Sequence, residues 1–183
     1  MTAEQKRLVR ESFPEIRDMA GPISMLFYGR LFAVDSSLRG MFRQDIALQG
    51  RKLMDMLNAV VESIDHLEQL QPTLRALGQR HTGYGVRPEH YRYVEDALLW
   101  AMGTAIDQAF FPECKDAWRV LIKTISGIMK EAADELPAEE RQLGLCILQL
   151  LACRTHGVVV ARACLNLNSL DYRRGCRGTI DGV

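Results

Sequence analysis

The 183-residue sequence lacks several features that mark common classes of protein. Lys plus Arg and Asp plus Glu each total 23, so the formal net charge is zero. A nucleic-acid-binding domain normally carries an excess of basic residues, and the balanced charge therefore argues against that class. There is no uncharged apolar stretch of transmembrane length, about 18 residues. The N-terminal residues MTAEQKRLVRESF contain no signal-peptide pattern. We expect a cytoplasmic protein that does not span a membrane or bind nucleic acid.

Cysteine motifs are also missing. The five cysteines are odd in number and form neither CxxC nor CxxCH. Since no export signal accompanies them, free thiols in a reducing cytoplasm are the simplest interpretation.

What the sequence does contain is enough apolar residues, 48% of the chain, to bury the core of one domain. Apolar residues recur at intervals of three and four along most of the first 135 residues, which is the spacing of amphipathic helices. Residues suited to begin helices precede these rows: Thr2 (with Gln5 as a capping box), Asp35, Asp45, Pro88 and Pro112. The sequence predicts an all-α fold with short connections.

Proline and glycine mark where these helices bend or end. We expect Pro14 to bend or loosen the first helix and Pro72 to break the helix that leads to His81. Gly83 and Gly85 then end that helix.

A few polar residues lie on or beside the apolar rows and are candidates for chemistry. His81 follows Leu77 by four residues, so both lie on one inward stripe. Spacing alone leaves two roles open for it, a hydrogen-bonded core histidine, which is commoner, and a ligand. Tyr28, Phe42 and Gln49 are individually ordinary components of a helical core.

Taken together, these residues match a known pattern. The matching segments are LFYGRLF (26–32), GMF (40–42), LQGRKLM (48–54), LRALGQRHTGYGV (74–86) and PEHYRYV (88–94). From about Leu8 to about Ala133 the chain resembles the globin family. The likeness is closest to bacterial single-domain globins and the globin domain of flavohaemoglobins, with some likeness to neuroglobin. The 32-residue step from Gln49 to His81 equals the family's interval between distal and proximal positions. Trp118 stands where these globins often carry tryptophan in the last helix.

This resemblance implies a globin fold, a 3-over-3 helical sandwich around haem b, over residues 1–135, with a C-terminal extension at 136–183. It also implies roles for individual residues. His81 would be the proximal iron ligand, Phe42 would pack against the haem face, and Tyr91 would lie beside the proximal histidine. The residues implied on the distal side are Tyr28, Gln49 and Leu53. Lys52 is either a partner of a haem propionate or an ordinary surface lysine, and Arg80 is a weaker candidate for the same propionate.

The distal residues implied by the resemblance predict how gases bind. Dioxygen on ferrous haem becomes partly negative, and the Tyr28 hydroxyl and the Gln49 amide are both hydrogen-bond donors. We therefore expect a pentacoordinate ferrous haem that binds O2 tightly and releases it slowly. CO and NO are further expected ligands. Tyr28 also remains a candidate ligand of ferric iron.

One position departs from the flavohaemoglobin pattern. There a glutamate supports the tyrosine beside the proximal histidine, but the corresponding position here is Ala133, and Glu131 and Glu135 lie two residues to either side. Because two residues turn a helix by about 200°, we expect neither Glu131 nor Glu135 to replace that glutamate. The missing carboxylate leaves two functions open, an oxygen-binding protein and a nitric oxide dioxygenase. The second would require a separate reductase, because the chain has no GxGxxG motif and no room for a reductase domain.

The residues after 135 are not covered by the resemblance. Leu136-Pro137 should end the last globin helix, and a new helical, leucine-rich run begins at Glu139. The three valines at 158–160 favour a strand or a buried helix face, and Cys146, Cys153 and Cys164 share one helical stripe. An apolar face of this kind needs a cover, either the globin body or a second subunit in a homodimer. A haem-based sensor that signals through this extension is a third possible function.

Overall fold

The computed structural model describes residues 1–42 and 45–137, and this part of the chain is helical with no strand. The helices are α1 (Ala3–Asp18), α2 (Ala20–Val34), η1 (Ser36–Met41), α3 (Ile46–Glu62), α4 (Leu67–Gly83), α5 (Pro88–Ile106), η2 (Asp107–Ala109) and α6 (Pro112–Asp134). This confirms the all-α prediction. Among these helices none has the length and apolar character required to cross a bilayer.

Local sequence signals set the helix starts. The Thr2 hydroxyl accepts a hydrogen bond from the Gln5 amide at 3.1 Å, and the Gln5 side chain accepts one from the Thr2 amide at 2.9 Å. Asp35 caps η1 through the Ser37 amide at 3.0 Å, and Asp45 caps α3 in the same way. Prolines occupy the first position of α5 and of α6. The predicted caps are therefore confirmed, because each satisfies a backbone amide that the helix leaves unpaired.

The predicted break at Pro72 is wrong. Helix α4 runs without interruption from Leu67 to Gly83, and α1 likewise continues through Pro14. Both prolines are exposed, as is Glu68, whose carbonyl loses its amide partner to Pro72. Because water can solvate that carbonyl, the helix tolerates the missing hydrogen bond.

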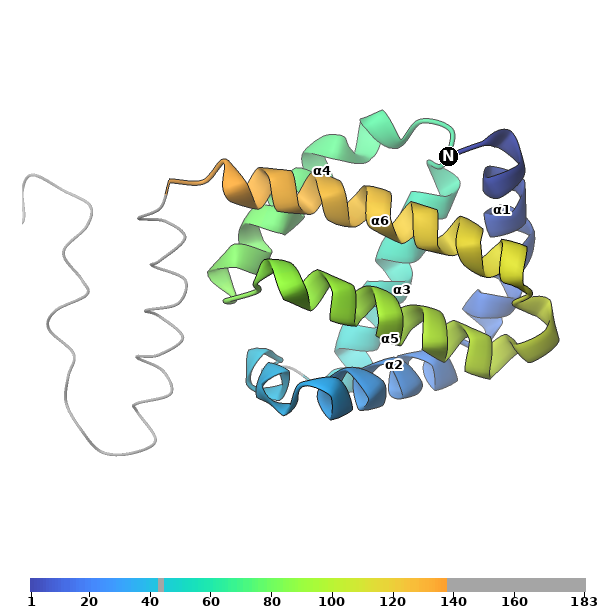
Figure 1. The fold of residues 1–183 in the computed structure, drawn as a ribbon, viewed down its shortest axis with the longest axis horizontal. Helices are drawn as coiled ribbons and strands as arrows, with labels where there is room; N and C mark the ends of the chain where they lie inside the picture. Colours follow the sequence, from blue (N-terminus) through green and yellow to red (C-terminus); the bar gives the residue numbers. More distant parts are fainter. Residues whose placement is uncertain (43–44, 138–183) are drawn as a thin grey trace, which may run out of the picture.

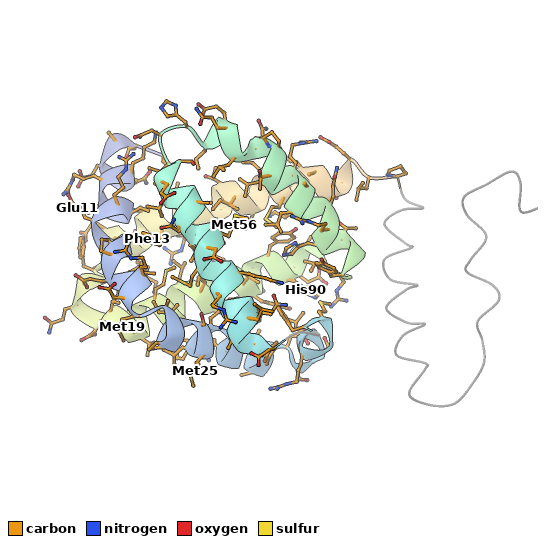
Figure 2. The ribbon with its side chains drawn as sticks, turned by 180° about the vertical axis from the view of Figure 1, so that it is seen from behind. Glu11, Phe13, Met19, Met25, Met56 and His90 are labelled. Atoms are coloured by element: carbon orange, nitrogen blue, oxygen red, sulfur yellow. The ribbon has the colours of Figure 1, made fainter. Side chains whose placement is uncertain are left out.

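Four pairs of helices make the most extensive contacts. In Figure 1, α5 and α6 lie side by side, and in Figure 2, seen from behind, α3 with Met56 crosses in front. The closest pairs are α4 with α6, α2 with α5, α1 with α6 and α2 with α3. Within the described residues, consecutive helices α3 and α4 are not a packed pair, since each packs on a different neighbour. The helices that carry Gln49 and His81 are thus held apart by their other partners.

Trp118 is the centre of the core and is fully buried. Its indole Nε1 donates to the Ser12 hydroxyl at 2.9 Å, and that hydroxyl donates in turn to the Leu8 carbonyl at 2.8 Å. The bond joins α1 to α6 across 106 residues of sequence. It satisfies the only polar atom of a buried indole.

Ser12→Ala is expected to destabilise the protein by about 1–3 kcal/mol, because it leaves the Trp118 N–H buried without an acceptor. Urea denaturation followed by circular dichroism measures the change. Thr104→Ala is the matched control, since the Thr104 hydroxyl also donates to a carbonyl four residues earlier but is exposed. An equal loss in both variants would contradict a specific role for the indole bond.

The end of α6 agrees with the sequence, because the helix finishes at Asp134, just before Leu136-Pro137. Cys114 is buried and free, as predicted. The other four cysteines, the leucine-rich run from Glu139 and the valines at 158–160 lie outside the described residues.

Candidate functional site

The C-terminal turn of α4 places His81 at the edge of the helix bundle. The Tyr84 amide donates to the His81 carbonyl at 3.0 Å, and the Val86 amide donates to the same carbonyl at 3.0 Å. Gly85 has φ of 80°, a backbone conformation that glycine adopts without strain. The chain therefore turns sharply around His81 and reverses into α5.

The His81 imidazole is oriented as a ligand would need to be. Its Nδ1 lies 2.8 Å from the Leu77 carbonyl oxygen. Because a carbonyl only accepts, Nδ1 carries the proton and Nε2 keeps its lone pair. Burial and, to a smaller extent, the nearby Arg80 cation lower the pKa of His81, while the bond to Leu77 opposes that shift. The side chain is thus a neutral imidazole with one free nitrogen, and the exposed Tyr84 ring lies 6.1 Å from it.

Tyr28 lies in a cluster of aromatic rings formed by α2 and the residue that follows η1. Its ring centroid is 5.3 Å from that of Phe42 in an edge-to-face arrangement, and Phe27 and Phe32 pack on it as well. The hydroxyl forms no hydrogen bond within the described residues. Among the described residues, every fully buried side-chain N or O atom has a hydrogen-bond partner. Because the Tyr28 hydroxyl has none, it must contact solvent-accessible space. Burial raises the pKa of Tyr28 to about 12, and the hydroxyl therefore stays protonated at neutral pH.

Helix α3 carries the other predicted distal residues. Gln49 and Leu53 are half-buried, and Lys52 is exposed. Gly50 between them faces α2, where an added Cβ would lie 2.7 Å from Ser24 Cβ. This close approach seats α3 on α2, so the distal residues of both helices belong to one rigid unit.

The structure thus joins some predicted site residues and keeps others separate. Tyr28 and Phe42 are in contact, and Leu53 packs against the same core. No described contact links His81 to them, because α4 packs on α6 and not on α3. A neutral imidazole with a free nitrogen on one side and an aromatic wall with a donor hydroxyl on the other suit a flat apolar ring such as haem.

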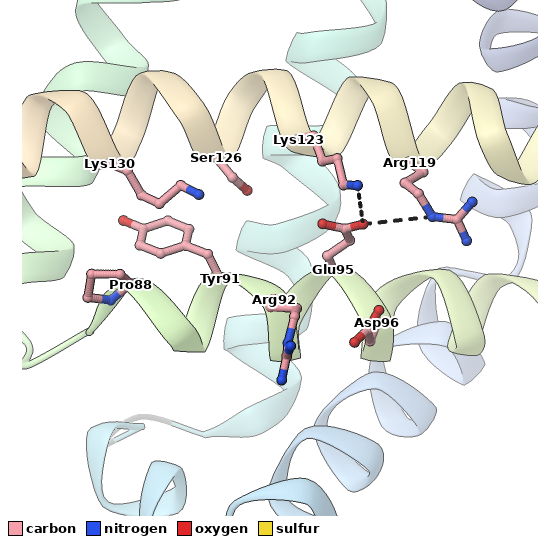
Figure 3. Close-up of a pocket in the computed structure, with 9 residues that line it drawn as sticks. All are labelled: Pro88, Tyr91, Arg92, Glu95, Asp96, Arg119, Lys123, Ser126 and Lys130. Carbon is pink, nitrogen blue, oxygen red and sulfur yellow. Dashed lines mark ion pairs between the residues drawn. The ribbon is translucent and has the colours of Figure 1, made fainter.

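Tyr91, implied by the resemblance to lie beside the proximal histidine, comes from the first turn of α5. Its ring lines a groove of about 570 Å³ between α5 and α6, with the Lys130 ammonium 5.9 Å from the ring centroid (Figure 3). Farther along the groove, Glu95 lies 3.8 Å from both Arg119 and Lys123. No hydrogen bond joins Tyr91 to His81, whose Nδ1 is already bonded to Leu77.

Sequence reasoning also missed one carboxylate. The field of Asp134, together with burial as the larger cause, raises the pKa of Tyr91. Glu131 is exposed, and Glu135 pairs with Arg75 of α4. Counting residues had pointed to Ala133, but one further residue turns the helix by about 100°, and the packing of α6 decides which carboxylate acts on Tyr91.

Several characterised proteins are similar to this chain. It is 27% identical over 145 residues to the flavohemoprotein of Halalkalibacterium halodurans, covering 78% of this chain and 35% of that protein. It is 30% identical over 132 residues to the flavohemoprotein of Deinococcus radiodurans, covering 70% and 33%. Neuroglobin of Tetraodon nigroviridis is 26% identical over 132 residues, covering 64% and 83%. The chain spans about a third of the length of the flavohemoproteins it matches.

Solved structures share the fold. An engineered carbene transferase from Rhodothermus marinus superposes with a TM-score of 0.67 at 22% identity, covering 83% of this chain and 99% of that one. A bacterial globin from Campylobacter jejuni superposes with a TM-score of 0.65 at 20% identity, covering 73% and 97%. The globin family model matches residues 26–129. The chain is therefore a member of the globin family and, as such, a haem-binding protein.

Proposed function

We propose that this globin binds dioxygen reversibly at a haem b held by His81, with the sixth coordination position open in the ferrous state. Residues 1–135 would form the globin domain, in the cytoplasm. The observation that carries the proposal is the Tyr28 hydroxyl, a donor without a partner within the described residues, set in an apolar aromatic cluster. When bound, the haem supplies the iron at which dioxygen binds.

The chain's own residues would then control the strength of binding. His81 Nε2 would ligate the iron, with the ring held by the bond from Nδ1 to the Leu77 carbonyl. Tyr28 donates a hydrogen bond to the gas ligand and stays protonated, because its pKa is about 12. Gln49 would be the second donor, Phe42 and Leu53 would be the apolar contacts, and Lys52 would meet a propionate. A hydrogen bond to a partly charged acceptor contributes roughly 1.5–3 kcal/mol.

Tyr28→Phe is expected to speed O2 dissociation by about 10- to 150-fold, the equivalent of that hydrogen-bond energy. CO dissociation should change much less, since bound CO is less polar and gains less from a donor. Stopped-flow displacement of O2 by CO measures the first rate, and displacement of CO by NO measures the second.

Folding should be unaffected by this variant, because the hydroxyl has no partner to lose. Tyr93→Phe is the matched control, since that tyrosine is partly buried against the core but lies on α5. Unchanged O2 release in Tyr28→Phe would show that Gln49 alone donates, or that no distal donor acts. A six-coordinate ferrous spectrum without added ligand would contradict the open position.

A nitric oxide dioxygenase is the second candidate, favoured by the flavohemoprotein relatives. That reaction converts one NO, one O2 and one electron to nitrate, and the electron would have to come from a separate reductase. Ala133 stands where the flavohaemoglobin pattern has a glutamate, and this difference favours oxygen binding over the enzyme. Repeated NO consumption with NADPH and a cellular reductase fraction decides between them, because a carrier stops after one equivalent.

A further inference from the structure

The outer face of α4 carries few charged side chains. The exposed residues on this face are Gln69, Pro72, Thr73, Ala76, Gln79, Arg80 and Gly83, and Arg80 is the single charge among them. A solvent-facing helix surface normally carries several charged side chains. This face is therefore poor in charge around Ala76 and Gly83, although Gln69, Thr73 and Gln79 are polar.

The same face is hollowed. A groove of about 560 Å³ runs over Ala76, Gln79, Arg80 and Gly83 and is bounded by Leu136. Ala76 and Gly83 are two helical turns apart, and a Cβ added at Gly83 would meet nothing within 4 Å. Small residues at this spacing leave room for the side chains of an apposed segment.

The described residues end beside this groove. Leu136 lines it, and Pro137 precedes the remaining 46 residues, 138–183. Within them, residues 143–153, LGLCILQLLAC, contain no charged side chain. A stretch this apolar requires a cover, and the groove on α4 adjoins Leu136, next to the point where the described residues end.

We propose that residues 143–153 of this chain dock in the groove on the outer face of α4, over Ala76 and Gly83. Five residues lie between Pro137 and Leu143, and the six steps of an extended chain span up to about 20 Å. Glu139 and Glu140 lie in this connection, and Arg80 has no carboxylate partner among the described residues. Opposite charges thus adjoin the groove on both partners.

The docked segment would contact the helix that bears the haem ligand, because His81 directly follows Arg80. Helix α4 packs on α6 alone among its close pairs, with Gly78 against Met129, so the segment would be its second support. The inference rests on the groove and the sequence after Pro137, and it does not depend on O2 binding.

Hydrogen–deuterium exchange of the full-length protein, read by mass spectrometry, tests the docking. Amides of 143–153 should exchange at least tenfold more slowly than in an unstructured peptide of the same sequence. Ala76→Glu, which places a charge in the groove, should remove that protection. Ala33→Glu is the control, the same change at an exposed alanine of α2, and should keep it.

A reciprocal variant keeps the test independent of Ala76. Leu148→Asp in the segment should speed exchange of the amides at 76–83 in α4, while circular dichroism shows the fold intact. The proposal is overturned if 143–153 are unprotected in the wild type, or if Ala76→Glu leaves them protected. Protection that appears only as protein concentration rises would instead assign the segment to a homodimer.

Discussion

His81→Gly is expected to abolish stable haem retention while the helices remain folded. The variant removes the imidazole whose Nε2 lone pair is free and whose Nδ1 is fixed by Leu77 at 2.8 Å. Without an axial ligand the haem is held only by apolar contacts, and the Soret absorption of the purified protein should fall by about tenfold or more. Far-ultraviolet circular dichroism should change little, because His81 lies in the last turn of α4.

Two further measurements make the result specific. Imidazole added to His81→Gly should restore a Soret band, since a small free ligand fits the space left by the side chain. His66→Ala is the matched control, because His66 precedes the same helix but its side chain is 66% exposed, and haem content should stay at the wild-type level. Full haem occupancy in His81→Gly would mean that another residue ligates the iron.

Gly78→Ala is expected to be among the most damaging single substitutions in the core. An added Cβ would lie 2.2 Å from the Met129 carbonyl oxygen and 2.7 Å from Met129 Cα, which are backbone atoms that cannot turn aside. Helix α4 would have to move away from α6, its main partner. Overpacking of this kind costs about 3 kcal/mol. At this chain size, that lowers Tm by about 10 °C.

Thermal unfolding of the apoprotein measures this cost without any contribution from haem. Gly29→Ala is the control, since a Cβ at Gly29 meets nothing within 4 Å. Because alanine favours a helix, that variant should be stabilised by about 0.4–1 kcal/mol. Equal Tm values for the two variants would contradict the close α4–α6 contact. Haem should also be lost faster from Gly78→Ala, because Gly78 and His81 lie one turn apart.

Local signals explain why the helices were predictable and why one prediction failed. Caps such as Thr2 and Asp35 act on backbone amides two or three residues away, so the sequence contains both partners. Pro72 was expected to break α4, but its effect depends on whether water reaches the Glu68 carbonyl. Exposure of that kind is a property of the folded chain.

The candidate site likewise has features that the sequence predicted and features that depend on the folded chain. Haem ligation by His81 follows from its resemblance to the globin pattern, and its free Nε2 agrees with that role. Tyr91 was expected beside the proximal histidine, and the fold adds that its ring lies near Lys130 of α6. The sequence left open which carboxylate of α6 acts on Tyr91, because that depends on the rotation of the helix. Asp134, after burial, is the carboxylate that raises the pKa of Tyr91.

By itself the sequence determined the helices, their caps, the family and the order of the site residues, because these depend on spacing along one chain. The tertiary structure alone decided which helices pack together. Gly78 against Met129 draws α4 onto α6, and Gly50 against Ser24 draws α3 onto α2. Those two contacts hold the His81 helix and the Gln49 helix on different partners. The physical reason is that close packing depends on steric fit between residues distant in sequence, and periodicity within one segment contains no information about that fit.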